Sequence, residues 1–202
     1  QLLQQLQPEP LHRAIPLGNH VSVTLHEAGH ILGSAIVQID VGAQHGASRR
    51  IVFTGDLGQK SQPLIRDPAI VEGADALLIE STYADRDHPS VEDVMGRIKG
   101  FNEDIHQQKS RLIIPAFSVG RTQHILYALN KLVEQRRIPV TPVYVDSPLA
   151  SKATAIYARH RECYDEDADA MVRRGDDPLK FPGLQFTHSV QESMALNGKP
   201  GA

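Results

Sequence analysis

The sequence predicts an α/β fold, and two features of its 202 residues carry that prediction. Up to Tyr83, short segments of β-branched and apolar residues follow one another across turns, which is typical of adjacent strands. Beyond Pro89, short apolar segments alternate with longer helical ones, which predicts parallel strands joined by crossover helices. We therefore expect a strand-rich first part and a second part with a mainly parallel sheet.

The first part contains four predicted strands. A glutamine-rich segment with helical character precedes these strands and ends at Pro8 and Pro10. We therefore expect the sequence to start partway through a domain. The last of the four strands is a continuous apolar run, which is typical of a strand that is covered on both faces. The four segments are VSVTL (21–25), SAIVQI (34–39), RIVFTG (50–55) and ALLIES (76–81).

The second part alternates strands and helices. Its first helix is expected from Ser90 to Gln108, with Ser90 as N-cap and Asp93 three residues on, as in a capping box. The sheet of this part is expected to continue beyond the last residue of the sequence. We therefore expect the sequence to be a fragment at both its N-terminus and its C-terminus. The other predicted elements are strands at 111–115 (RLIIP), 142–146 (PVYVD) and 184–188 (LQFTH), and helices at 119–135, 149–163 and 189–196.

Composition excludes several classes of protein. Apolar residues make up 41% and charged residues 22% of the chain, as in ordinary globular proteins. No segment approaches the roughly 20 apolar residues of a membrane-spanning helix, and the N-terminal residues lack the pattern of a secretory signal. The single cysteine, Cys163, excludes an internal disulfide and fits a reducing cytoplasm. A net charge of −3 predicts a local polyanion site rather than a broadly basic face.

Residues 26–30 read HEAGH and match the zinc-peptidase pattern H-E-x-x-H. That pattern works on a helix, which places its two histidines one turn apart. Here a strand pattern precedes it, and Gly29 and Gly33 each weaken a helix by about 1 kcal/mol. The longer form of the motif needs a histidine where this chain has Ile36. A peptidase remains the alternative, and the favoured interpretation places His30 alone in a site, on a turn between two strands.

Two carboxylates follow predicted strands. Asp56 comes directly after RIVFTG, and Glu80 ends the apolar run LLIE. The carboxyl ends of strands are where α/β sheets place their chemistry, and a carboxylate there can bridge two divalent metals. A structural alternative stays open for each carboxylate. Asp56 could be a turn aspartate that caps the next segment, and Glu80 could be a glutamate in a salt bridge at the end of its strand.

Six segments together resemble the metallo-β-lactamase superfamily, in its β-CASP branch of RNA- and DNA-processing nucleases. They are AGHILGSA, FTGDLG, IESTYADRDH, IPAFSVGRTQHILYAL, VYVDSPLA and HSVQESMALN, which lie within residues 19–198. Each segment is weakly specific, but their order and spacing agree with the family. The resemblance implies the C-terminal half of a metallo-β-lactamase αββα domain over residues 1–86. Most of an α/β β-CASP domain, with a mainly parallel sheet, is implied over residues 87–202.

The resemblance also assigns roles. It implies that His30 binds one zinc ion, that Asp56 bridges two, and that Glu80 supports a ligand histidine and proton transfer. In the intact family enzyme, two zinc ions hold a hydroxide that attacks the phosphodiester in line. The family's main ligand cluster, H-x-H-x-D-H, does not occur in this sequence. We therefore expect weak or no zinc binding, and little hydrolysis, from this chain alone.

Three residues are candidates for contacts with the phosphates of a substrate. Arg121 opens a predicted helix after a predicted buried strand, so its guanidinium and the helix N-terminus could both meet a phosphate. Ser147 is the expected N-cap of a helix that starts with Pro148. His88 lies near the junction of the two implied domains. A structural alternative stays open for Arg121, which could form an ion pair with a nearby carboxylate.

These observations favour a fragment of a zinc-dependent ribonuclease of RNA processing or decay. A truncated paralogue that binds RNA or a partner without cutting, and the zinc peptidase, remain the alternatives. The expected partner is RNA, in single-stranded form, with DNA left open. No membrane contact is expected, the location implied is cytoplasmic, and the resemblance allows a homodimer.

Overall fold

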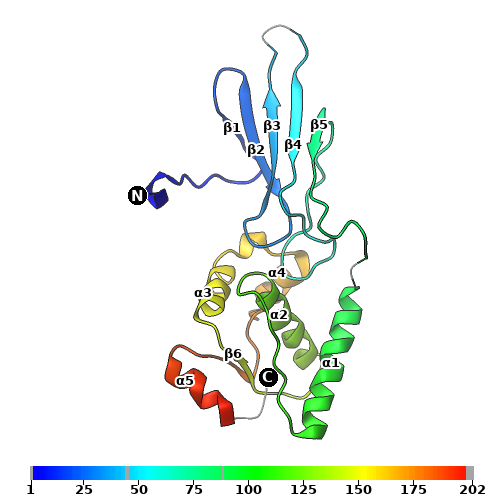
Figure 1. Ribbon diagram of the computed structural model, residues 1–202, viewed down its shortest axis with the longest axis vertical. Helices are drawn as coiled ribbons and strands as arrows, with labels where there is room; N and C mark the ends of the chain where they lie inside the picture. The colour runs from blue at the N-terminus through cyan, green and yellow to red at the C-terminus, as the bar shows by residue number, and fades with distance from the viewer. Residues whose placement is uncertain (1, 44–45, 88, 199–202) are drawn as a thin grey trace. The chain divides into compact units, whose positions relative to one another are not determined.

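A computed structural model describes residues 2–43, 46–87 and 89–198 of the chain. The chain forms two compact units (Figure 1). Unit 1 consists of Gln1–Gln62 and Asp67–Arg86, and unit 2 consists of Pro63–Arg66 and Asp87–Ala202. Within the described ranges, no helix has both the length and the apolar character that crossing a bilayer requires.

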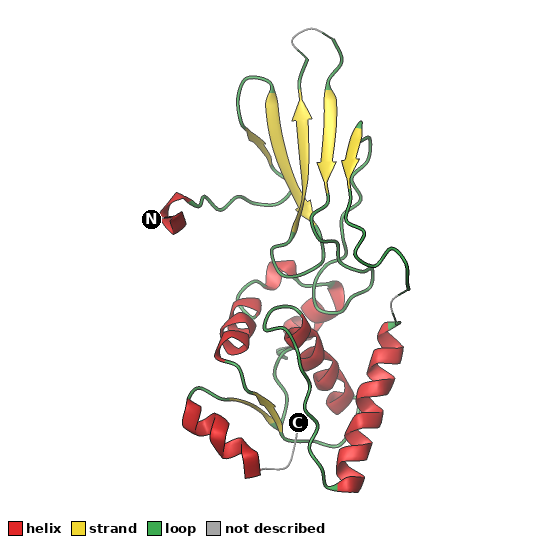
Figure 2. Ribbon diagram, viewed as in Figure 1, coloured by secondary structure: helices red, strands yellow, loops and turns green. Residues whose placement is uncertain are grey.

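Unit 1 is built on one five-stranded sheet in the order β1-β2-β3-β4-β5 (Figure 2). Strands β1 to β4 are antiparallel in succession, and β5 runs parallel to β4. Strands β2, β4 and β5 therefore point the same way and end at the same edge of the sheet. The four predicted strands are confirmed, whereas β1 was not predicted because three residues are too few for a periodic signal. The elements are η1 (Leu2–Gln5), β1 (Ala14–Pro16), β2 (Val21–Glu27), β3 (Ala35–Val41), β4 (Arg49–Phe53) and β5 (Ala76–Leu78).

One face of this sheet carries a row of polar side chains. The ring Nε2 of His26 lies 2.9 Å from Oε1 of Gln38, and the Gln38 amide donates to Asp40. Nε of Arg50 donates to the other carboxylate oxygen of Asp40 over 2.7 Å. The hydrogen bond from Arg50 is the main reason that the pKa of Asp40 is lowered. The row is therefore a connected polar network across three strands.

The same face holds a small apolar core at one end. Ala28, Ile36 and Val52 are buried there. Leu57 and Val71, from the long connection between β4 and β5, pack against them. That connection therefore covers part of this face of the sheet.

Strand β5 is not covered on both faces, so that prediction is wrong. Leu77, Leu78 and Ile79 are 55%, 52% and 61% exposed. Strand β5 lies at the end of the sheet order and, among the described strands, pairs with β4 alone. The described residues of unit 1 include no α-helix that could cover it. An apolar run shows that a strand can be buried, but not that a second layer is present.

Unit 2 is an α/β unit in which two short parallel strands lie among helices (Figure 2). The predicted capping box at α1 is confirmed: the Asp93 amide donates to Oγ of Ser90, and the Ser90 amide donates to the Asp93 carboxylate. The elements are α1 (Val91–Gln108), α2 (Arg121–Glu134), β6 (Val143–Val145), α3 (Pro148–Tyr157), η2 (Arg161–Cys163), α4 (Glu166–Arg173), β7 (Leu184–Phe186), α5 (Val190–Ala195) and η3 (Leu196–Gly198).

Two predictions for unit 2 are wrong. Residues 111–115 form no strand, and Ile113 is 78% exposed. Strand propensity reflects packing against neighbours, and this apolar segment has no strand partner among the described residues. The helix predicted at 149–163 ends at Tyr157, and η2 follows it after a turn. Helix α4 was not predicted, although Asp165 caps it by accepting from the amide of Ala168.

A short segment between β4 and β5, Pro63–Arg66, belongs to the core of unit 2. Leu64 and Ile65 are 0% and 1% exposed. The Leu64 amide donates to the Asp165 carboxylate over 2.8 Å, and the Asp165 amide donates to the Leu64 carbonyl. Burial raises the pKa of Asp165. The segment is thus fixed by both packing and paired hydrogen bonds.

Candidate functional site

The three candidate residues of unit 1 follow the three strands that end at one edge of the sheet. His30 lies in the turn after β2, Asp56 in the loop after β4, and Glu80 shortly after β5. Because these strands point the same way, their C-terminal loops meet. The sheet topology therefore brings together residues that are up to fifty positions apart in sequence.

The turn that carries His30 is held by side chains of its neighbours. Oγ of Ser34 accepts hydrogen bonds from the amides of His30 and Ile31 over 3.1 and 3.2 Å. The buried carboxylate of Glu27 accepts from the amide of Gly29 over 3.2 Å. Gly29 has a φ of 63°, which glycine adopts without strain. The turn presents an exposed His30, as the favoured interpretation predicts.

The zinc-peptidase alternative is wrong. His26 and Glu27 are the last residues of strand β2, and a turn follows them. The peptidase pattern needs a helix to place its histidines one turn apart. His26 instead bonds Gln38 within the sheet, and Glu27 supports the turn.

The loop that carries Asp56 is tied to the strand end that carries Glu80. The Leu57 amide donates to Oε1 of Glu80 over 2.7 Å. Thr54, which is buried, accepts from the Glu80 amide through Oγ1 over 3.3 Å, and its own amide donates to the Leu78 carbonyl. Thr54 was not singled out from the sequence, because one threonine after a strand gives no distinctive signal.

The loop after Asp56 also lies against the His30 turn. The Gly58 amide donates to the Ala28 carbonyl over 2.8 Å. A Cβ atom on residue 58 would lie 1.7 Å from the carbonyl oxygen of Gly29, which is far inside van der Waals contact. Gly58 is therefore required for the two loops to approach this closely.

Glu80 is held as a carboxylate at this edge. Hydrogen bonds from Thr82, and then from the Leu57 amide, lower the pKa of Glu80, and the nearby charge of His30 contributes in the same direction. The lowered pKa keeps Glu80 ionised at neutral pH, where it accepts hydrogen bonds. Asp56 is exposed beside it.

The donor types at this edge suit zinc, but their number does not. Imidazole nitrogen and carboxylate oxygen are both zinc ligands, and a zinc site takes four ligands. Across the described ranges there is no group of three His, Cys, Asp or Glu placed to hold a metal ion. His30, Asp56 and Glu80 share an edge of the sheet, yet on their own they do not fit a zinc ion.

A second cluster lies in unit 2, where β6 ends and two helices begin. We call it the serine cluster: Ser118, Arg121 and Ser147. Ser147 is the N-cap of α3, as predicted; its Oγ accepts from the Ala150 amide and lies 3.3 Å from Oγ of Ser118. Arg121 is exposed and is the first residue of α2, also as predicted. The structure thus brings Ser147 to the turn that leads into Arg121.

Gln123 holds this turn in place and was missed from the sequence. It is fully buried. Its Oε1 accepts from the Gly120 amide over 2.7 Å, and its Nε2 donates to the Ser118 carbonyl and to Oγ1 of Thr154. The available signal was an amide side chain on the largely apolar buried face of α2, which it shares with Asn130.

Asp146, next to Ser147, is engaged within unit 2. Its two carboxylate oxygens accept from Oγ1 of Thr187 over 2.7 Å and from Oγ of Ser193 over 2.8 Å. These bonds join the end of β6 to the segments around β7 and α5. His88, the remaining candidate for substrate contact, lies outside the described residues.

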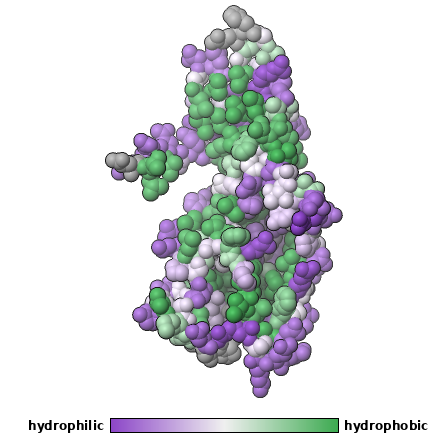
Figure 3. Space-filling view, in the orientation of Figure 1, coloured by the Kyte–Doolittle hydropathy of each residue, from purple (hydrophilic) through white to green (hydrophobic). Residues whose placement is uncertain are grey.

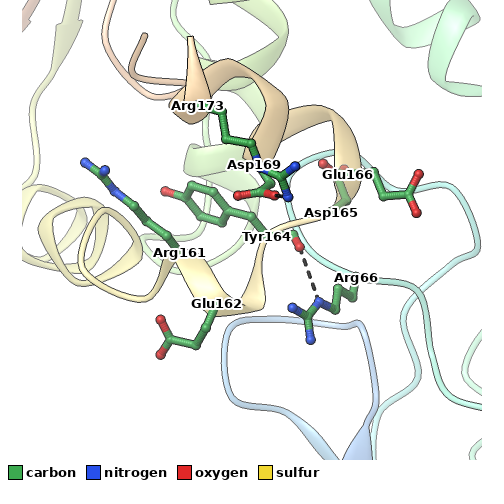
Figure 4. A pocket seen from close by; sticks show the side chains of 8 residues that line it. All are labelled: Arg66, Arg161, Glu162, Tyr164, Asp165, Glu166, Asp169 and Arg173. Atoms are coloured by element: carbon green, nitrogen blue, oxygen red, sulfur yellow. Dashed lines mark hydrogen bonds and ion pairs between the residues drawn. The ribbon is translucent and has the colours of Figure 1, made fainter. Parts of the chain in front are cut away.

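Unit 2 also contains a pocket of about 530 Å³ whose lining mixes both charge signs (Figure 4). In Figure 4, Nε of Arg66 donates to the Tyr164 carbonyl. Arg173 and Asp169 form an ion pair at the same pocket. None of the candidate residues lines it. Its lining consists of Arg66, Arg161, Glu162, Tyr164, Asp165, Glu166, Asp169 and Arg173.

Comparison with known proteins decides the family. Residues 122–202 match the model of the Beta-Casp domain. The chain belongs to the β-CASP family. Gln123 and Ser147 fall within the matched β-CASP domain, and Arg121 directly precedes it.

Curated relatives agree with this assignment. Ribonuclease TTHA0252 of Thermus thermophilus is 33% identical over 181 residues, which are 90% of this chain and 40% of the relative. Transcription termination factor FttA of Methanosarcina mazei is 31% identical over 187 residues, which are 89% of this chain and 29% of the relative. Endoribonuclease YSH1 of Mycosarcoma maydis is 24% identical over 191 residues, which are 94% of this chain and 21% of the relative. The chain thus spans less than half the length of each of these relatives.

Proposed function

We propose that this chain is part of a zinc-dependent β-CASP ribonuclease, which hydrolyses phosphodiester bonds in RNA processing or decay. Residues 1–86 are then the C-terminal half of a metallo-β-lactamase αββα domain, and residues 87–202 are most of the β-CASP domain. The names of two relatives support a nuclease, since they are a ribonuclease and an endoribonuclease.

The observation that carries the proposal is the meeting of three loops at one edge of the unit 1 sheet. In our assignment His30 and Asp56 bind metal, Asp56 and Glu80 are catalytic, and Glu80 supports a ligand histidine and proton transfer. The hydrogen bonds through Thr54, Leu57 and Gly58 hold these loops in register. Further ligands come from polypeptide outside these residues, so the isolated chain binds zinc weakly and hydrolyses little.

Titration calorimetry with zinc tests the metal assignment. We expect weak binding of at most one ion per chain, and loss of that binding in His30→Ala. His160→Ala, which removes an exposed histidine of unit 2, is the matched control and should bind as the unaltered chain does. Tight binding of two zinc ions per chain, or binding that survives His30→Ala, would contradict the assignment.

The substrate assigned is single-stranded RNA, with Arg121 and Ser147 of the serine cluster contacting phosphates. The N-termini of α2 and α3 add partial positive charge and amide donors beside these residues. His88 is retained as a further candidate contact. Because overall charge is −3, binding must come from such local groups.

Fluorescence anisotropy with a short RNA tests the substrate assignment. Arg121→Ala should weaken binding and reduce the slope of log affinity against log salt by about one. Arg159→Ala removes another exposed arginine of unit 2 and should leave that slope unchanged. An unchanged slope in Arg121→Ala would give Arg121 a structural role. Competition with DNA of the same sequence separates the two nucleic acids.

A further inference from the structure

The eight residues that line the pocket of unit 2 are all charged, apart from Tyr164. Figure 3 shows, by contrast, apolar residues gathered over the sheet of unit 1. At about 530 Å³, the pocket has the volume of a small-molecule site, which is about 300–1,000 Å³. Most such sites are largely apolar, so a lining of this kind indicates a small charged ligand.

Tyr164 contributes a hydroxyl group that no described residue bonds. The residue is 3% exposed, and its backbone bonds Arg161 and Arg66. In Figure 4 its hydroxyl points to the side of the pocket where Arg161 lies. Burial raises the pKa of Tyr164 to about 12, so the hydroxyl stays a hydrogen-bond donor at neutral pH. A donor on so buried a side chain costs free energy when it lacks a partner, and an acceptor in the pocket would recover it.

Two arginines at the pocket are each held through one nitrogen atom. Nε of Arg161 donates to the Ala158 carbonyl over 3.3 Å, and Nε of Arg66 donates to the Tyr164 carbonyl over 3.4 Å. Within the described ranges, neither guanidinium forms an ion pair with a carboxylate, so their Nη groups can bind a ligand. A guanidinium held in this way presents a fork of N–H donors, which matches the oxygens of an anion.

Four carboxylates also line the pocket and oppose an anion, but three of them already have partners. These partners are an arginine, two backbone amides and a histidine. The three carboxylates are those of Asp169, Asp165 and Glu162. Glu166 is the fourth, and Figure 4 shows it on the opposite side of the pocket from Arg161. The side that contains Arg161 and the Tyr164 hydroxyl is therefore where an anion fits.

We propose that this pocket binds a phosphate group, with the Tyr164 hydroxyl and the Nη groups of Arg161 donating to its oxygens. The fork of Arg161 takes two oxygens and the hydroxyl takes a third, whereas a carboxylate ligand offers only two. Arg66 places a second cation at the same pocket. Inorganic phosphate and the phosphate of a nucleoside monophosphate share this chemistry. None of these residues belongs to the serine cluster or to the loops of His30 and Asp56.

Titration of the chain with inorganic phosphate, followed by the amide resonances of η2 and α4, tests the proposal. Phosphate should shift these resonances to saturation. Tyr164→Phe removes only the hydroxyl oxygen and should weaken phosphate binding about tenfold, because a hydrogen bond to a charged group is lost. The variant should unfold at the same urea concentration as the unaltered chain, since no described residue bonds the hydroxyl.

Two neighbouring arginines provide a matched contrast. Arg161→Ala should weaken phosphate binding about tenfold or more. Arg159→Ala removes an exposed arginine that does not line the pocket, and should leave phosphate binding unchanged. Adenosine monophosphate in place of phosphate separates the two sources. Tighter binding assigns the site to a nucleotide, and equal or weaker binding assigns it to free phosphate.

Weaker binding in Tyr164→Phe and in Arg161→Ala, with unaltered binding in Arg159→Ala, supports the proposal. An unaltered chain whose resonances do not shift to saturation overturns it. Binding that persists at full strength in both Tyr164→Phe and Arg161→Ala also overturns it. So does binding that is lost in Arg121→Ala alone, because the serine cluster would then hold the phosphate.

Discussion

Two short apolar segments of this chain are alike in composition and opposite in environment. Leu64 and Ile65 are essentially inaccessible inside unit 2, whereas Leu77, Leu78 and Ile79 stay more than half exposed at the edge of unit 1. The first pair is buried in unit 2, where Leu64 is anchored by hydrogen bonds with Asp165. The second segment follows a strand that has a partner on one side only within the described part of the chain. The difference shows that burial depends on the partner that a segment finds, and that unit 1 keeps apolar surface available.

The largest effect expected from this comparison is a difference between two identical substitutions. Ile65→Ala should lower the free energy of unfolding of unit 2 by about 2–5 kcal/mol, because it empties part of a packed core. Ile79→Ala removes the same atoms from an exposed position, and should change stability by about 0.5 kcal/mol or less. Urea unfolding followed by circular dichroism measures both. Equal effects would show that the two segments do not differ in burial as described.

Two glycines offer a second comparison, between a crowded and an open backbone. Gly58→Ala drives a methyl group into the Gly29 carbonyl and should destabilise unit 1 by about 1–3 kcal/mol. Gly96→Ala, in helix α1 with nothing within 4 Å, should stabilise unit 2 by up to about 1 kcal/mol. Thermal unfolding gives the sign of each change. A neutral Gly58→Ala would mean that the loops carrying His30 and Asp56 do not touch.

The smallest effect concerns pH. A hydrogen bond with Asp176 raises the pKa of Glu134 from its ordinary 4.5 to about 7. The folded chain then binds more protons than the unfolded chain in this window, so the free energy of unfolding should fall as pH rises from 4.5 to 7. The slope should be small, because Glu134 is exposed to solvent.

Urea unfolding at a series of pH values checks this, with Glu134→Gln and Glu103→Gln compared. Glu134→Gln should flatten the pH dependence of stability between 4.5 and 7. Glu103→Gln, in helix α1, should retain it. If both variants keep the slope of the unaltered chain, another group is responsible for it.

The sequence predicts those parts of the fold that local patterns determine. The period-two segments of unit 1 and the capping box at Ser90 are present as expected, and so is the N-cap at Ser147. The turn at His30 could be predicted because Gly29 and Gly33 favour positive φ, which both adopt. These features depend on residues within a few positions of one another.

The rest depends on partners that lie far away in the sequence. Residues 111–115 have the composition of a strand, but no neighbouring strand pairs with them among the described residues. The apolar run of β5 likewise predicted a strand that is covered on both faces, but the described residues of unit 1 do not cover both faces of this strand. Within the candidate site, Thr54 and Gln123 act through hydrogen bonds to loops whose positions are set by the tertiary fold. The metal and substrate roles of His30, Asp56, Glu80, Arg121 and Ser147 stay predictions.

Hydrogen exchange read by mass spectrometry tests most directly whether the two units differ as described. Unit 2 encloses Leu64 and Ile65, so the amides of this segment should exchange slowly. Residues 77–79 of unit 1 are more than half exposed, so their amides should exchange markedly faster. Equal protection of the two segments would contradict this account.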